Sequence, residues 1–202
     1  MTPTTPHGSD DPYSSVRSFC GELADVVARN RDTGETVQTV KDRLADLIRR
    51  SPELPDQVCR AGTDHYARHL LYRDRSERFE VVVMAWAPGQ ETPVHDHAGI
   101  WCVEGVARGR IVVTRYDMAR NARPESTRLE QLEIIRAGLG ECGALIPPVE
   151  YHKISNPFDH LALTIHVYGG LMRQCRIFEP QPDGEWIVQT HPLAFERPEP
   201  AL

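Results

Sequence analysis

In the N-terminal part of the chain, apolar residues recur three and four positions apart, which predicts amphipathic helices. One such stripe covers residues 13–30, and a second follows it and ends at Ser51-Pro52, where the proline stops the helix. Residues 30–34 are expected to separate the two helices, and residues 55–60 to form a further short helical piece. We interpret these helices as a packing layer.

Beyond Gly62 the pattern changes to short apolar or alternating runs divided by turn residues, which is typical of β-strands. So many short strands favour a sandwich or barrel over a parallel α/β fold. Gly105 and Gly109 suit a tight turn, residues 117–127 an exposed loop, and residues 197–200 a solvated tail. The expected strands cover residues 66–72, 78–87, 95–97, 100–106, 109–116, 128–135, 143–146, 151–156, 161–168, 175–179 and 185–189.

The length of 202 residues favours one main domain with a small addition. We therefore expect a disordered tail over residues 1–12, a helical segment over residues 13–61 that packs on a barrel, and the β-barrel domain itself over residues 62–196.

Charge and composition exclude some classes of function. The net charge of −6 and the absence of a basic patch argue against a nucleic-acid binder. No apolar run is long enough to span a membrane, and the polar N-terminus lacks the apolar region of a signal peptide. The five cysteines form no CxxC pair, so we expect free thiols in a reducing, cytoplasmic compartment.

Two histidines one residue apart are the first candidate for chemistry. His95 and His97 follow the turn signal Pro88-Gly89, and on an extended strand both side chains point the same way. Two imidazoles on one face make half of a metal site. A third ligand is needed, and the candidates are His152, His160 and His166. Zinc hydrolases also use three histidines, so the residues leave the metal open.

A second row of polar side chains lies on the strand predicted at residues 161–168. Leu163, Ile165 and Val167 face one way, and Thr164, His166 and Tyr168 face the other. A hydroxyl, an imidazole and a phenol in line can each donate to the next and fix its orientation. The alternative is a satisfied polar row on a half-exposed strand.

These segments together resemble the two motifs of the cupin superfamily, whose members are double-stranded β-helix, or jelly-roll, barrels. The resemblance implies a mainly β fold with N-terminal α-helices. Many cupins carry a glutamate ligand where this chain has Cys102. Glu104 lies two residues further on, off the motif's register but on the same face of a strand as Cys102. The first motif consists of Gly89, His95, His97, Cys102 and Gly109, and the second of Gly140, Pro147, His152 and Asn156.

Within the cupins, residues 66–178 resemble the cysteine dioxygenase family of thiol dioxygenases. The resemblance implies an iron(II) site held by His95, His97 and His152, beside a catalytic Ser-x-His-x-Tyr relay. Here the relay reads Thr164, His166 and Tyr168, and threonine in place of serine adds a methyl group.

The same resemblance assigns further site residues. Tyr66 and Arg68 match a Tyr-x-Arg segment that holds the substrate carboxylate, and Arg176 is a second candidate contact. Cys102 stands where some family members cross-link a cysteine to the relay tyrosine, here Tyr168; a buried free thiol is the alternative. Pro147-Pro148 is a candidate for a cis bond near the metal.

The implied activity is oxidation of a small carboxylate-bearing thiol, with L-cysteine favoured by Arg68, to its sulfinic acid with both atoms of dioxygen. The expected partners are this thiol and dioxygen, without nucleic acid or membrane, and the expected state is a monomer. Three alternatives stay open: a dioxygenase for 3-mercaptopropionate, a zinc or manganese isomerase or hydrolase, and a non-catalytic cupin that only binds a ligand.

Overall fold

A computed structural model describes residues 11–29, 32–119, 127–148, 151–197 and 199–202. Both predicted helices are present, as α1 (Ser14–Arg29) and α2 (Thr33–Arg49), followed by the short 3-10 helix η1 (Asp56–Val58). The expectation that residues 33 and 34 break the helices apart is wrong. The carboxylate of Asp32 accepts a hydrogen bond from the backbone N–H of Glu35 at 2.9 Å, so α2 begins directly after this cap.

Each of the eleven predicted strands has a counterpart in the described part of the chain, with ends that differ by a few residues. They form two antiparallel sheets, one ordered β1-β2-β9-β4-β7 and the other β11-β10-β3-β8-β5-β6. The strands are β1 (Ala67–Arg73), β2 (Glu80–Trp86), β3 (Val94–His95), β4 (Cys102–Arg108), β5 (Arg110–Met118), β6 (Leu129–Gly138), β7 (Cys142–Leu145), β8 (Tyr151–Ser155), β9 (Ala162–Tyr168), β10 (Gln174–Pro180) and β11 (Trp186–Pro192).

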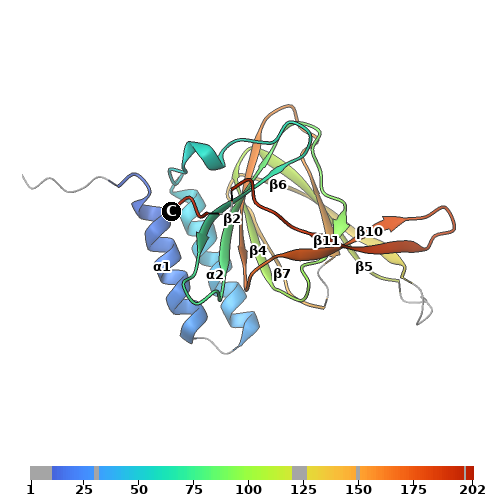
Figure 1. Ribbon diagram of the computed structural model, residues 1–202, viewed down its shortest axis with the longest axis horizontal. Coiled ribbons are helices and arrows are strands. Elements are labelled where there is room, and N and C mark those ends of the chain that lie inside the picture. The colour runs from blue at the N-terminus through green and yellow to red at the C-terminus, as the bar shows by residue number, and fades with distance from the viewer. Residues whose placement is uncertain (1–10, 30–31, 120–126, 149–150, 198) are drawn as a thin grey trace, which may run out of the picture.

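The five-stranded sheet separates two apolar layers. Its outer face, which includes Leu163, Ile165 and Val167, packs with the two helices. Its inner face, which includes Val82 and Trp86, packs with the six-stranded sheet. Figure 1 shows α1 and α2 side by side on one side of this sheet, and the β10–β11 hairpin at the far end of the molecule. The mainly β, two-sheet architecture with N-terminal helices confirms the predicted fold class.

Two glycines shape β4. Gly109, with φ of +72°, makes the turn from β4 to β5, as predicted. Gly105 does not belong to that turn: it lies inside β4, where an added Cβ would stand 2.6 Å from Cδ1 of Ile48. Its lack of a side chain therefore lets α2 approach the sheet closely.

The chain ends in contact with the edge strand β1. The backbone N–H groups of Ala201 and Leu202 donate to the carbonyls of Leu70 and Leu71, each at 3.0 Å. The described residues of the solvated tail predicted at 197–200 are exposed, as expected, and the two residues that follow it return to the sheet. The tail predicted at residues 1–12 and the loop at 117–127 lie largely outside the described residues.

The peptide bond between Pro147 and Pro148 is cis, as predicted. None of the helices in the described ranges is long and apolar enough to cross a membrane.

Candidate metal centre and substrate cavity

Three histidines converge between the two sheets. His95 of β3 pairs with His152 of β8 across the six-stranded sheet, and their Nε2 atoms lie 3.2 Å apart. The ring of His97 lies 5.4 Å from that of His95 and 4.9 Å from that of His152, between centroids. One ligand nitrogen from each of the three falls within 4.8 Å of the others.

The backbone around the two first histidines is fixed by a buried carboxylate. Asp96, fully buried, accepts hydrogen bonds from the backbone N–H of Arg176 at 2.8 Å and from its Nε at 2.6 Å. Ala98 and Gly99 then adopt positive φ, at 53° and 78°, and turn the chain towards β4. Side chains alternate along this segment, so that of Asp96 points to β10, and those of His95 and His97 point to the interior.

The histidine cluster fits a metal ion. Two nitrogens that each lie about 2.0–2.1 Å from one metal are about 3 Å apart, as the Nε2 atoms of His95 and His152 are. Both ring nitrogens of His97 are buried without a hydrogen bond. Burial lowers the pKa of His95 to about 4 and those of His97 and His152 well below 6.5, so all three rings are neutral, which is the form that binds metals.

The other two candidates for the third ligand lie elsewhere. The side chain of His160 is 83% exposed and lies next to Asp159. His166 belongs to a second buried group, with Cys102 and Glu104. The structure therefore brings His152, and not His160 or His166, together with the His-x-His pair.

The predicted relay divides into a hydrogen-bonded part and a stacked part. Oγ1 of Thr164 lies 2.7 Å from Nε2 of His166 and also accepts a hydrogen bond from Nε1 of Trp86 at 2.9 Å. The rings of His166 and Tyr168 lie nearly parallel, with centroids 6.0 Å apart. The hydrogen bonds of the described residues include none between these two rings, so Trp86, Thr164 and His166 form the connected unit.

Strand β4 supplies the neighbours of this row. In the β4–β9 register, Cys102 stands opposite Tyr168 and Glu104 opposite His166. Both β4 side chains are buried, and burial raises the pKa of Glu104 to about 7. The prediction that Glu104 shares the face of Cys102 is confirmed.

A cavity of about 460 Å³ opens beside the metal centre. His95 and Tyr168 line it, together with Tyr66 and Arg68 of the predicted carboxylate segment. Tyr66 stacks on Trp86 with ring centroids 4.6 Å apart. Burial raises the pKa of the Tyr168 phenol well above 10, so the phenol keeps its proton and can donate it in a hydrogen bond.

Arg68 is the charged group of this cavity. It is only 6% exposed, its guanidinium lies 5.0 Å above the ring of Phe195, and its Nη2 is buried without a hydrogen bond. Its charge contributes to the lowered pKa of His95 and of His166, which places it within electrostatic reach of the centre. A buried guanidinium with a free donor is suited to bind a carboxylate.

Arg176, predicted as a second carboxylate contact, does not line the cavity. Its guanidinium pairs with Asp96 and lies 5.6 Å above the ring of Phe178. Sequence reasoning missed Asp96, although its position between two candidate ligands was a signal. It also missed the hydrogen bond from Trp86 to Thr164, which no local pattern reveals.

Comparison with known proteins places this geometry in a family. The family model for cysteine dioxygenase type I matches residues 14–181, well over half of the chain, so the chain belongs to this family. Cysteine dioxygenase type 1 of Danio rerio is 19% identical over 115 residues, which are 56% of either protein. The chain therefore spans about half the length of this curated relative.

Two solved structures show a limited likeness to this chain. A Thermus thermophilus protein is 21% identical, with a TM-score of 0.46 over 58% of this chain and 95% of its own. A Klebsiella pneumoniae protein described as having a double-stranded β-helix domain is 18% identical, with a TM-score of 0.43 over 58% of this chain and 88% of its own.

The buried histidines predict that the metal-free protein loses stability in acid. His95 and His166, with pKa values of about 4 and about 3, and the two histidines with still more strongly lowered pKa values take up protons near pH 6.5 only when unfolded. Glu104, whose pKa rises from 4.5 to about 7, has the opposite effect. Between those pH values it takes up a proton only in the folded protein, which stabilises the fold as pH falls. The histidines outnumber it, so the free energy of unfolding should fall as pH falls below 6.5, by up to about 1.4 kcal/mol per pH unit for each net proton.

Chemical denaturation of the metal-free protein between about pH 8 and about pH 5 measures this dependence. A His160→Asn variant, changed at an exposed histidine, should show the same slope. A free energy of unfolding that stays constant down to about pH 5 would contradict the burial of neutral histidines.

Proposed function

We propose that this protein is an iron(II)-dependent thiol dioxygenase that oxidises a small carboxylate-bearing thiol, best L-cysteine, to its sulfinic acid. The observation that carries the proposal is that one cavity joins His95 of the histidine cluster, the phenol of Tyr168 and the unpaired Nη2 of Arg68. Membership of the cysteine dioxygenase type I family supports the same reaction. Iron(II), held by His95, His97 and His152, supplies the redox chemistry that joins dioxygen to the substrate sulfur.

The protein side chains bind and orient the thiol. The guanidinium of Arg68 takes the substrate carboxylate in a site from which water is largely excluded, and this leaves the thiol end free to reach the histidine end of the cavity. The protonated phenol of Tyr168 donates a hydrogen bond to the substrate or to the oxygen that it receives. Thr164 and Trp86 hold the ring of His166 beside this phenol.

The five cysteines, all in the described part of the chain, form no disulfide, which supports a cytoplasmic location for this chemistry. A rival cupin reaction with zinc or manganese would use the same three histidines but would leave Arg68 and Tyr168 without a role. Metal analysis of protein purified without added metal distinguishes the two, because the dioxygenase should contain iron.

The reaction is tested by oxygen uptake of the iron(II)-loaded protein with L-cysteine, 3-mercaptopropionate and mercaptosuccinate. We expect uptake to be fastest with L-cysteine and to be coupled to a product heavier by two oxygen atoms. Mass spectrometry of the product with labelled dioxygen checks that both atoms are transferred. Absence of uptake with all three thiols would contradict the proposal.

Replacing Arg68 should lower activity with thiols that carry a carboxylate and should spare activity with thiols that lack one. In Arg68→Gln, kcat/KM for L-cysteine should fall about 10- to 100-fold, because a charge-assisted hydrogen bond is lost in a buried site. Activity with cysteamine, the same thiol without its carboxylate, should change little. Arg110→Gln, at another arginine that covers an aromatic ring, is the matched control and should retain wild-type kinetics. An equal loss with both thiols would contradict the assignment.

The register of β4 and β9 supports a thioether cross-link between Cys102 and Tyr168, which are direct cross-strand neighbours. The bond would join Sγ of Cys102 to a ring carbon of Tyr168 that is ortho to the hydroxyl group. The thiol and ring hydrogens leave as two protons, and two electrons pass to dioxygen. Intact mass after aerobic turnover with iron should therefore decrease by two hydrogens, and should not decrease in Cys102→Ser or Tyr168→Phe. An unchanged wild-type mass would contradict the cross-link.

A further inference from the structure

Glu104 is a buried carboxyl group between the candidate metal centre and the hydrogen-bonded row of β9. It is 6% exposed. Its Oε1 lies 3.9 Å from Nδ1 of His152, and its Oε2 lies 3.5 Å from Nδ1 of His166. No other carboxylate forms ion pairs with these two histidines in the described part of the chain.

The first of these histidines needs an acceptor on the side away from the metal. His152 presents Nε2 to His95, so Nε2 is its ligand atom and Nδ1 carries the hydrogen. That Nδ1 is buried without a hydrogen bond. His95 shows the complete arrangement, because its Nδ1 lies 3.1 Å from the carbonyl of Pro93. Ring nitrogens opposite a ligand atom commonly donate to a carboxylate or carbonyl, which fixes the tautomer and the ring orientation.

The second histidine needs an acceptor for a different reason. The hydroxyl of Thr164 accepts from Trp86, so its own hydrogen is available to Nε2 of His166 at 2.7 Å. In this assignment Nε2 of His166 accepts a hydrogen bond and carries no hydrogen, so the hydrogen of the neutral ring is on Nδ1. Sγ of Cys102 lies 4.0 Å from this Nδ1, and the nearby oxygen, at 3.5 Å, belongs to Glu104.

We infer that Glu104 is a positioning residue that accepts hydrogen bonds from Nδ1 of His152 and of His166. It thereby couples a metal ligand to the relay, and it adds a carboxyl group to a centre that otherwise holds three neutral imidazoles. The inference deepens the proposed function and rests on its metal site, but not on the identity of the thiol. Its contact with His152 holds for either protonation state of Glu104, because each form keeps an oxygen that can accept a hydrogen bond.

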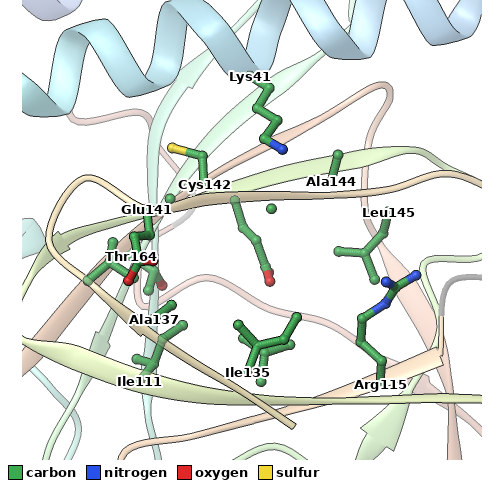
Figure 2. A pocket seen from close by; sticks show the side chains of 15 residues that line it. Lys41, Ile111, Arg115, Ile135, Ala137, Glu141, Cys142, Ala144, Leu145 and Thr164 are labelled. Carbon is green, nitrogen blue, oxygen red and sulfur yellow. The ribbon is translucent and has the colours of Figure 1, made fainter. Parts of the chain in front are cut away.

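A second cavity gives this side chain room to reach its partners. The two distances exceed the usual length of a hydrogen bond, about 2.7–3.2 Å, by less than about 1 Å. Glu104 lines a cavity of about 320 Å³ that is separate from the substrate cavity. Figure 2 looks into it, with Lys41 on the side of the helix and Ile135 and Arg115 on the opposite side. Open space on this side allows a small rotation of the carboxyl group that packed apolar side chains would prevent.

The test compares metal affinity in Glu104→Leu and Glu104→Gln with the wild type. Titration of the metal-free proteins with Co(II) or Zn(II), in competition with a chelating dye, gives the affinity without turnover. Glu104→Leu removes both acceptor oxygens but keeps the volume, and should bind about 10- to 100-fold more weakly. Glu104→Gln keeps one acceptor and should lie between Glu104→Leu and the wild type. Glu133→Gln, the same change at the exposed partner of Arg115, should bind as the wild type does.

Proton spectra of the Co(II)-loaded proteins give a readout that a merely structural role would not alter. Ligand histidines show shifted, exchangeable Nδ1–H signals, and the signal of His152 should exchange faster with water in Glu104→Leu. The signal of His95, held by the carbonyl of Pro93, should persist as an internal control. Melting temperatures of the metal-free variants verify that each is folded.

The outcomes separate this inference from the proposed function. Wild-type affinity and an unchanged His152 signal in Glu104→Leu would overturn the inference and leave the function intact. Weakened binding with the altered signal supports the inference, even if no thiol is oxidised. A wild-type protein that binds no divalent metal would overturn both.

Discussion

The structure depends on one constraint, the pairing register of β4 with β9 inside a sheet that is covered on both faces. Because side chains alternate along a strand, this register sends Cys102, Glu104, His166 and Tyr168 to the interior together, while Val103 and Val167 face the helices. A slip of one residue would exchange the two sets. The helices thus contribute to the site indirectly, since the apolar face that they cover fixes which face is left for chemistry.

Burying these groups has an electrostatic consequence. Imidazoles enclosed between two sheets lose the solvation that would stabilise their charged form, so His95, His97 and His152 stay neutral and available as ligands. The buried guanidinium of Arg68 lies at the wall of the cavity, over the ring of Phe195. A cluster of neutral donors beside one fixed cation favours a substrate that carries an anionic group, which is why we propose a carboxylate-bearing thiol.

The interior also shows a division of roles between two cavities. His95, Arg68 and Tyr168 belong to the wider one, whereas Glu104 and Thr164 belong to the other. His166 and His152 lie close to the carboxyl group that separates these two sides. The side chains proposed to bind the substrate therefore line a different cavity from Glu104, which we propose to orient the histidines.

Much of this arrangement was accessible from the sequence by itself. The period of the apolar residues determined the helices and strands, and alternation determined which side chains of β9 share a face, because both follow from local backbone geometry. The His-x-His spacing singled out His95 and His97, and the resemblance to a known family added His152. Only the tertiary structure decided that Arg176 binds Asp96, that Trp86 holds Thr164, that Gly105 admits α2, and that the chain end returns to β1. These contacts join segments far apart in sequence, so their partners depend on how the two sheets and the helices pack, which no local pattern encodes. Glu104 marks the boundary: its face could be predicted from alternation, whereas its position between two histidines depended on the packing of β4, β8 and β9.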